Sequence, residues 1–299
     1  MARMLFAVII AFTVILFFYQ EYNHPQLRFN SVADRLTHPF DTRLRYSIGY
    51  IDPQFKLSPH DLQALAHEAT LIWEQPLKQA LFLYDPKAKL KIELIYDERQ
   101  QESNARHRMI QEIEAKQKKW KFQQQKITQK SQEIHALDQS IREKKHKLNL
   151  EIELFNRQLQ QSAVQRQLEL QQTRGQDLKW QNDQLKLQVS SFNQKVLQFN
   201  QAVDQVNQLN QDIEHAIQQF HRDFQPRLFD KGQFNGQQIL IYEFSSKEDL
   251  KLTLAHEFGH ALGLKHHQDP KGLMHAMLEQ QNFAHFKLMP SDLTLFNQR

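Results

Sequence analysis

The sequence predicts an α/β domain (of the α+β kind) that is interrupted by a long antiparallel α-helical coiled-coil hairpin and preceded by a transmembrane helix. Three observations lead to this prediction. An uncharged apolar run opens the chain, segments with strand and helix periodicity flank its middle, and the middle is almost free of proline and glycine. The expected parts are a membrane anchor over residues 1–22, a linker over 23–42, a folded domain built from 43–100 and 226–299, and a helical insertion over 101–225.

Composition excludes several classes of protein. The formal net charge is only +4 over 299 residues, and basic and acidic residues are interleaved, so the chain lacks the basic stripe that nucleic-acid binding needs. The chain contains no cysteine, which excludes disulfides, thiol nucleophiles and cysteine-ligated zinc. Histidine and carboxylate side chains therefore remain as the candidate metal ligands.

The apolar run "MLFAVIIAFTVILFFY" (residues 4–19) is preceded by Arg3 and followed by Glu21. Its length is also that of a secretory signal core, but no small-residue cleavage pattern follows it. We therefore expect an uncleaved single-pass anchor rather than a signal peptide or a buried core helix. The positive flank would stay in the cytoplasm, which places the remaining chain outside a cell inner membrane, on the periplasmic side.

Strand and helix signals alternate on both sides of the middle segment. The segments 44–51 and 90–96 alternate like strands, and the segment between them begins with a capping Ser58 and Pro59 and continues as a helix to Pro76. After the insertion, residues 237–244 predict a third strand. Serines 245 and 246 then cap a helix that extends to about Leu262.

The insertion carries two apolar ladders with a seven-residue period, which predicts two helical arms. The first ladder comprises Ile113, Trp120, Ile127, Ile134, Ile141, Leu148 and Phe155, and the second comprises Leu178, Leu185, Phe192, Phe199, Val206, Ile213 and Phe220. Arms folded antiparallel, with a turn between about residues 160 and 175, would bring the two ends of the insertion together. A solvated arm without a partner and pairing between two chains are the alternatives. The hairpin would present its tip to a protein partner.

A histidine-rich segment, "HEFGHALGLKHH" (residues 256–267), carries the chemistry. His256 and His260 lie one helical turn apart on the same face, and Gly263 allows a sharp turn that returns His266 to the same ion. Three imidazoles leave Zn2+ a fourth position for water, whose proton Glu257 would take before the hydroxide attacks a carbonyl group. The expected reaction is peptide hydrolysis.

The pattern H-E-x-x-H-x-x-G-x-x-H, followed by Met274 in "PKGLMHAM", resembles the metzincin zinc metalloproteases and their matrixin branch. The resemblance implies that Met274 forms a turn below the metal and that the residues after it wall a substrate pocket. It also implies that strand 237–244 is an edge strand that pairs with the substrate, which makes Ile239, Ile241 and His275 candidate substrate-binding residues. His275 stands where matrixins commonly have tyrosine.

The remaining histidines have more ordinary interpretations. His67 opens a similar "AHEAT" segment, but Leu71 occupies the position of a second ligand, so we expect His67 to be structural. His267 is expected to be an exposed neighbour of the ligand His266. His275 and His285 are candidates for assisting the oxyanion, although surface or packing roles are the simpler expectation.

The sequence therefore predicts a membrane-anchored zinc endopeptidase that acts on protein or peptide substrates. One alternative is a periplasmic scaffold or adaptor that presents the hairpin, with the metalloprotease domain secondary. Another is a metal hydrolase directed at glycan or cell-wall substrates, which the same zinc-activated water would serve.

Overall fold

The structure is a computed structural model that describes residues 2–161, 165–225, 230–278, 281–283 and 286–299, without the side chains of residues 2–11, 161 and 165–171. The chain divides into two compact units. Residues 1–107 and 226–299 form the first, the catalytic unit, and residues 108–225 form the second, the hairpin unit. The catalytic unit therefore keeps the first turns of α4 (Glu98–Gln161), which the predicted boundary at residue 101 assigned to the insertion.

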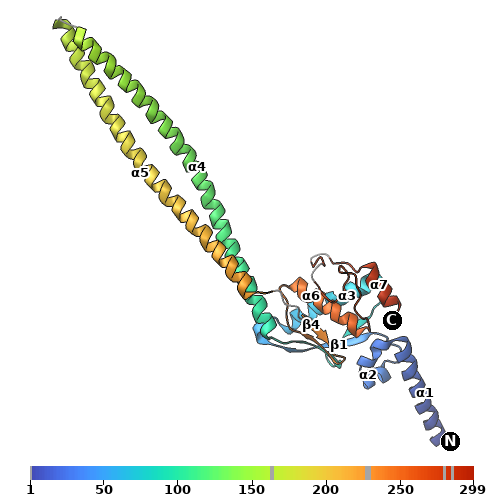
Figure 1. Cartoon of the computed structure of the whole chain (residues 1–299). Coiled ribbons are helices and arrows are strands. Elements are labelled where there is room, and N and C mark those ends of the chain that lie inside the picture. The colour runs from blue at the N-terminus through green and yellow to red at the C-terminus, as the bar shows by residue number, and fades with distance from the viewer. Residues whose placement is uncertain (1, 162–164, 226–229, 279–280, 284–285) are drawn as a thin grey trace. The chain divides into compact units, whose positions relative to one another are not determined.

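The catalytic unit is built on a five-stranded sheet with the order β2-β1-β3-β5-β4 (Figure 1). The strands β2, β1, β3 and β5 run parallel, and β4 pairs antiparallel with β5. Their bounds are Leu44–Ile51 for β1, Phe82–Tyr84 for β2, Leu90–Leu94 for β3, Gly232–Phe234 for β4 and Gln238–Ile241 for β5. The three predicted strands are thus present, and two three-residue strands are added to them.

Two helices cover one face of this sheet, α3 (Pro59–Leu77) and α6 (Lys247–Ala261). Both begin at the predicted serine caps. The Ser58 side chain accepts a hydrogen bond from the Asp61 amide, and the Ser246 side chain accepts one from the Asp249 amide. The core lies between the helices and the sheet, where the Trp73 indole of α3 donates to the Ala255 carbonyl of α6 at 2.8 Å. This bond fixes α6, and with it the histidine motif, against the domain core.

Helix α3 does not stop at Pro76 as predicted. It continues to Leu77, and Lys78 then ends it in the left-handed conformation, with φ 52°. A proline in the last turn removes only one backbone donor, so the helix tolerates it there.

The predicted linker over residues 23–42 is wrong, because this segment is folded onto the catalytic unit. It forms the short helices η1 (Pro25–Phe29) and α2 (Val32–Thr37), and Leu27 is fully buried. The Asn30 side chain donates to the Arg43 carbonyl and accepts from the Arg45 amide, which ties the segment to β1. The sequence lacks the apolar periodicity that would have predicted this packing.

Helix α1 (Ala2–Asn23) covers the predicted membrane anchor. Among the residues searched, those that the structure describes, no helix is long and apolar enough to cross a membrane. The first part of the apolar run, up to Ala11, lies outside the residues whose side chains are described. The anchor therefore stays a prediction.

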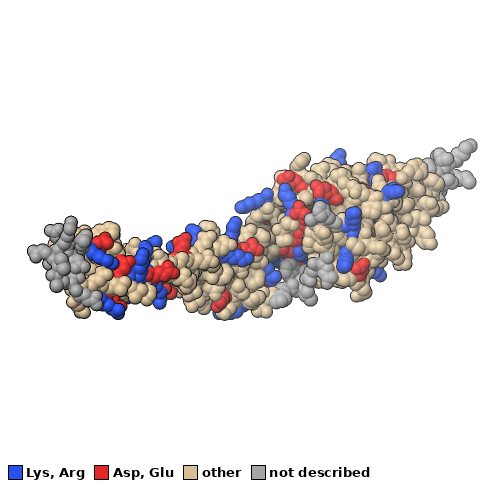
Figure 2. Space-filling view, turned by 90° about the horizontal axis from the view of Figure 1, so that it is seen from above, with Lys and Arg blue, Asp and Glu red and all other residues tan. Residues whose placement is uncertain are grey.

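The hairpin unit contains α4 from Arg108 onward and α5 (Gln165–Asp223), which lie side by side in Figure 1. Helix α4 ends at Gln161 and α5 begins at Gln165, both within the predicted turn region, and residues 162–164 between them lie outside the described part. None of the fourteen ladder residues is exposed, and five of them are buried: Ile141, Leu148, Leu178, Val206 and Ile213. Lys144 on α4 bonds to Gln188 on α5 at 3.2 Å, which is the pairing expected of antiparallel arms. On the face drawn in Figure 2, basic and acidic side chains are interspersed.

Candidate metal centre

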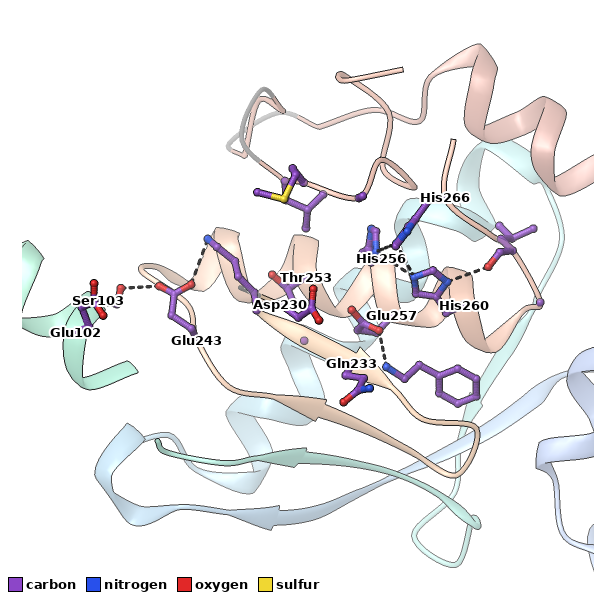
Figure 3. A pocket seen from close by; sticks show the side chains of 18 of the residues that line it. Glu102, Ser103, Asp230, Gln233, Glu243, Thr253, His256, Glu257, His260 and His266 are labelled. Carbon is purple, nitrogen blue, oxygen red and sulfur yellow. Dashed lines mark hydrogen bonds and ion pairs between the residues drawn. The ribbon is translucent and has the colours of Figure 1, made fainter. Parts of the chain in front are cut away.

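Three histidine side chains converge at the C-terminal end of α6. The Nε2 atoms of His256, His260 and His266 lie 3.1–3.2 Å from one another, and Figure 3 shows the three rings pointing toward a common centre. Zn–N bonds of about 2.0–2.1 Å at tetrahedral angles would place ligand nitrogens roughly 3.3–3.4 Å apart. The observed spacing therefore fits one zinc ion held by three imidazoles. The structure brings together all three predicted ligands.

Hydrogen bonds fix which ring nitrogen faces the centre. His256 Nδ1 donates to the Leu273 carbonyl at 2.6 Å, and His260 Nδ1 donates to the Leu264 carbonyl at 2.9 Å. Because a carbonyl oxygen can only accept, the proton lies on Nδ1 and the Nε2 lone pair is free to bind metal. Burial lowers the pKa of His256 to about 3 and also lowers the pKa values of His260 and His266. All three rings are therefore neutral at pH 7, as ligation requires.

The two glycines of the motif serve different purposes. Gly263 has φ +94°, a left-handed conformation that ends the helix and turns the chain toward His266. Gly259 is helical, but a Cβ atom there would collide with the Met274 sulfur and would lie 2.9 Å from Trp73 Cζ2. Gly259 thus gives Met274 and Trp73 room to pack against α6, which the sequence alone did not reveal.

Met274 lies fully buried in the turn beneath the histidines, where the resemblance to matrixins places it. Asp292 of α7 (Pro290–Asn297) holds this turn, accepting from the amides of Leu273 at 3.0 Å and Met274 at 2.9 Å. His267 donates to the same carboxylate at 2.8 Å. The expectation that His267 is merely an exposed neighbour of the ligands is therefore wrong, because its ring is largely buried and pairs with Asp292.

Glu257 lies beside the histidines and is almost completely buried, with 4% of its surface exposed. Burial raises its pKa to about 8. The backbone amide of Phe234 donates to Glu257 Oε2 at 2.7 Å, so the edge strand β4 orients this carboxylate (Figure 3). No sequence signal pointed to Phe234, because β4 is only three residues long.

Two predicted substrate contacts are wrong. The strand β5 is not an edge strand, since β3 and β4 pair with its two sides, and the side chains of Ile239 and Ile241 are fully buried in the core. The edge of the sheet near the site is β4. No strand other than β5 pairs with β4 in the part of the chain that the structure describes.

The other histidines lie away from the metal centre or outside the described residues. His275 does not line the cavity beside the centre, because its Nδ1 is turned toward the Met277 backbone. The residues after Met274 that do line this cavity are Ala276, Met277 and Leu278. His67 is exposed on α3, and His285 lies outside the described residues.

Comparison with known proteins agrees with this geometry. The family model for matrixin matches residues 40–298. Searches of curated proteins and of solved structures gave no significant match. Matrixins are zinc metalloproteases, and the three-histidine group is the one cluster of potential metal ligands found among the described side chains. The match covers most of the chain, so the protein belongs to the matrixin family of zinc metalloproteases.

Proposed function

We propose that this protein is a membrane-anchored, zinc-dependent endopeptidase in which Glu257 is the general base. The observation that carries the proposal is the convergence of the His256, His260 and His266 Nε2 atoms beside the buried carboxylate of Glu257. A zinc ion held there supplies Lewis acidity, lowering the pKa of a water molecule and polarising a carbonyl group.

The protein's own contribution is to hold and move the proton. Glu257 takes a proton from the attacking water and delivers it to the departing amine. Burial raises the pKa of Glu257, which favours a carboxylate that can take up a proton and release it again. Because the Phe234 amide occupies Oε2, the other oxygen, Oε1, is the one available to the water.

The free edge of β4 provides a place for the substrate backbone. An extended peptide that pairs with an exposed strand gains main-chain hydrogen bonds whatever its sequence. β4 also bonds to Glu257 through Phe234, so a peptide on this edge lies next to the general base. We therefore propose that β4, rather than the strand predicted at residues 237–244, is the edge strand that pairs with the substrate.

The proposed location is a cell inner membrane, with the catalytic unit on the periplasmic side. Its support is the uncharged apolar run over residues 4–19, with Arg3 before it. Extraction of membranes with carbonate, followed by N-terminal sequencing, tests this location. A mature protein that begins near residue 20 would contradict the anchor.

The catalytic proposal is tested by zinc analysis and cleavage of peptide libraries by the zinc-loaded full chain. Glu257→Ala should retain zinc and lose turnover by about 10²–10⁴-fold or more, whereas His256→Ala should lose zinc and activity together. Muropeptides serve as the alternative substrates. Absence of peptide cleavage by the zinc-loaded wild type would overturn the proposal, as would near-normal cleavage by Glu257→Ala.

A further inference from the structure

A cavity of about 620 Å³ extends from the histidine cluster along α6 toward the first turns of α4. Figure 3 shows Glu243 and Ser103 at the end away from the histidines, with Thr253 and Asp230 between that end and Glu257. We call the group formed by Glu243, Asp249 and Lys231 the acidic end. The cavity is large enough to accept a long side chain.

The position of Thr253 links the acidic end to the reaction site. Thr253 precedes Glu257 by four residues and His256 by three, so it lies one helical turn away on the same face of α6. When the scissile bond of a substrate lies beside Glu257, a substrate side chain that enters the cavity passes Thr253 before it reaches Glu243. The cavity therefore receives a side chain next to the scissile bond.

One buried oxygen atom in this cavity, Thr253 Oγ1, lacks a hydrogen-bond partner among the described residues, and its residue is 1% exposed. A second, Glu243 Oε2, lies in a residue 4% exposed and has only an ion-pair contact of 3.4 Å with Lys231 Nζ. The other oxygen of Glu243 accepts from the Ser103 hydroxyl at 2.5 Å. Since leaving a buried acceptor unsatisfied is costly, a ligand that donates hydrogen bonds at this end would be stabilised.

The acidic end also carries an excess of negative charge, since two of its three side chains are carboxylates and one is an ammonium group. Lys231 Nζ bonds to both oxygens of Asp249, at 3.0 and 2.8 Å, and lies 3.4 Å from Glu243 Oε2. Two carboxylates thus share one ammonium group. Burial would lower the pKa of Lys231, but the charges of Asp249 and Glu243 outweigh it and raise the pKa, so Lys231 stays protonated.

The other charged side chains that line the cavity away from the metal centre do not offset this excess. Glu102 and Arg106 form an ion pair at 3.8 Å, so their charges cancel. Arg28 and Asp230 also line the cavity and carry opposite charges. One further positive charge would balance the acidic end.

We propose that this cavity selects substrates with a basic side chain, lysine or arginine, beside the scissile bond, and that Glu243 determines this preference. The inference rests on the proposed peptidase function. An acidic side chain is disfavoured because Lys231, the cation nearest to Glu243, is already bonded to Asp249. An ammonium or guanidinium group donates to Thr253 Oγ1, which lacks a partner among the described residues, and to Glu243 Oε2, whose one ion pair is the 3.4 Å contact with Lys231. It also supplies the missing charge.

The test measures kcat/KM of the zinc-loaded full chain in detergent on a matched peptide series. Each of the two positions that flank the cleaved bond is varied among lysine, norleucine and glutamate. Norleucine keeps the length of lysine without its charge. At one of the two positions we expect lysine to be cleaved at least about tenfold faster than norleucine, and glutamate to be the slowest.

Glu243→Gln should reduce the lysine-to-norleucine ratio to about one while the zinc content is retained. Thr253→Val, which removes only the hydroxyl, should lower the same ratio several-fold. The matched control is Glu68→Gln, an exposed carboxylate on α3 that should leave the ratio unchanged.

The outcomes separate the two proposals. If the wild type cleaves no peptide, the peptidase function fails. If it cleaves peptides with equal rates for lysine and norleucine at both positions, or prefers glutamate, the function stands and this inference is overturned. If folded, zinc-loaded Glu243→Gln still prefers basic side chains, Glu243 does not determine the preference. Because the wild-type series decides the preference alone, a misfolded variant leaves the test intact.

Discussion

The backbone amide of Phe234 donates a hydrogen bond to Glu257 Oε2 at 2.7 Å, which connects the edge strand of the sheet directly to the proposed general base. The strand therefore combines two proposed roles in one segment. Its outer side offers a pairing edge, and one of its amides fixes the orientation of the carboxylate. A substitution in β4 that removes this amide should therefore lower the catalytic rate without changing the metal ligands.

Replacing Phe234 by proline removes this amide donor. A hydrogen bond to a charged group contributes about 1.5–3 kcal/mol, so kcat/KM should fall roughly ten- to hundredfold with zinc content unchanged. Phe234→Ala is the control, because it keeps the amide and loses only side-chain packing, including the contact with Phe29 at 4.9 Å. Equal activities of the two variants would show that this hydrogen bond does not matter for catalysis.

Alanine at Gly259 and at Gly263 should destabilise the catalytic unit for different reasons. At Gly259 the added Cβ meets Met274 and Trp73, and overpacking of this kind costs about 1–3 kcal/mol. At Gly263 the space is open, but φ +94° is strained for alanine, at about 1–2 kcal/mol. Urea unfolding followed through zinc release measures both.

The control for these variants is Gly175→Ala on α5, where the nearest atom to a Cβ is Phe155 Cζ at 3.4 Å. This substitution should leave zinc release unchanged. A Gly259→Ala variant as stable as the wild type would mean that Met274 and Trp73 can move aside, which would contradict the close packing described here.

Stability should fall in acid through Asp41, which bonds to Arg43 and Arg45 at the start of β1. Burial would raise the pKa of Asp41, but hydrogen bonds and charges from the two arginines outweigh it and hold the pKa below its usual value. A lowered pKa in the folded state stabilises the protein above the unfolded-state value, about 3.9, and this contribution is lost as pH falls through the folded-state pKa.

The free energy of unfolding of the wild type should therefore decline below about pH 4 more steeply than that of Asp41→Asn. Urea titrations between pH 2 and 6 measure the difference. Asp204→Asn, at an exposed position on α5, should behave like the wild type. Parallel pH profiles for the wild type and Asp41→Asn would show that the arginine contacts do not contribute.

Spin labels at positions 127 and 206 should lie within about 15 Å in the monomer, since paired helix axes lie about 8–10 Å apart. The bond between Lys144 and Gln188 supports the antiparallel register that pairs these positions. Pulsed electron spin resonance at low protein concentration measures the distance. Mixing labelled with excess unlabelled chain is the control, because dilution would weaken a signal that arises between chains. A distance of several tens of ångströms would exclude the hairpin.

Local signals in the sequence predicted the longer elements correctly. The alternation of 44–51 gave β1 with its observed bounds, and serine caps gave the starts of α3 and α6. The short strands β2 and β4 were not predictable, because three residues carry no periodicity and their pairing comes from neighbouring strands. The N-terminal segment was misread as a linker for a related reason: its packing depends on side chains such as Asn30 that bond to a distant part of the chain.

The sequence by itself determined the candidate metal ligands and the proposed base, because His256, Glu257 and His260 lie about one helical turn apart and Gly263 turns the chain back to His266. Their geometry follows from the 3.6-residue period of a helix, which is a local property. Only the tertiary structure decided which strand forms the open edge, which groups surround the cavity and why Gly259 is a glycine. Those features join residues far apart in the chain, such as Trp73 with Gly259 and Ser103 with Glu243, and no local pattern records such contacts.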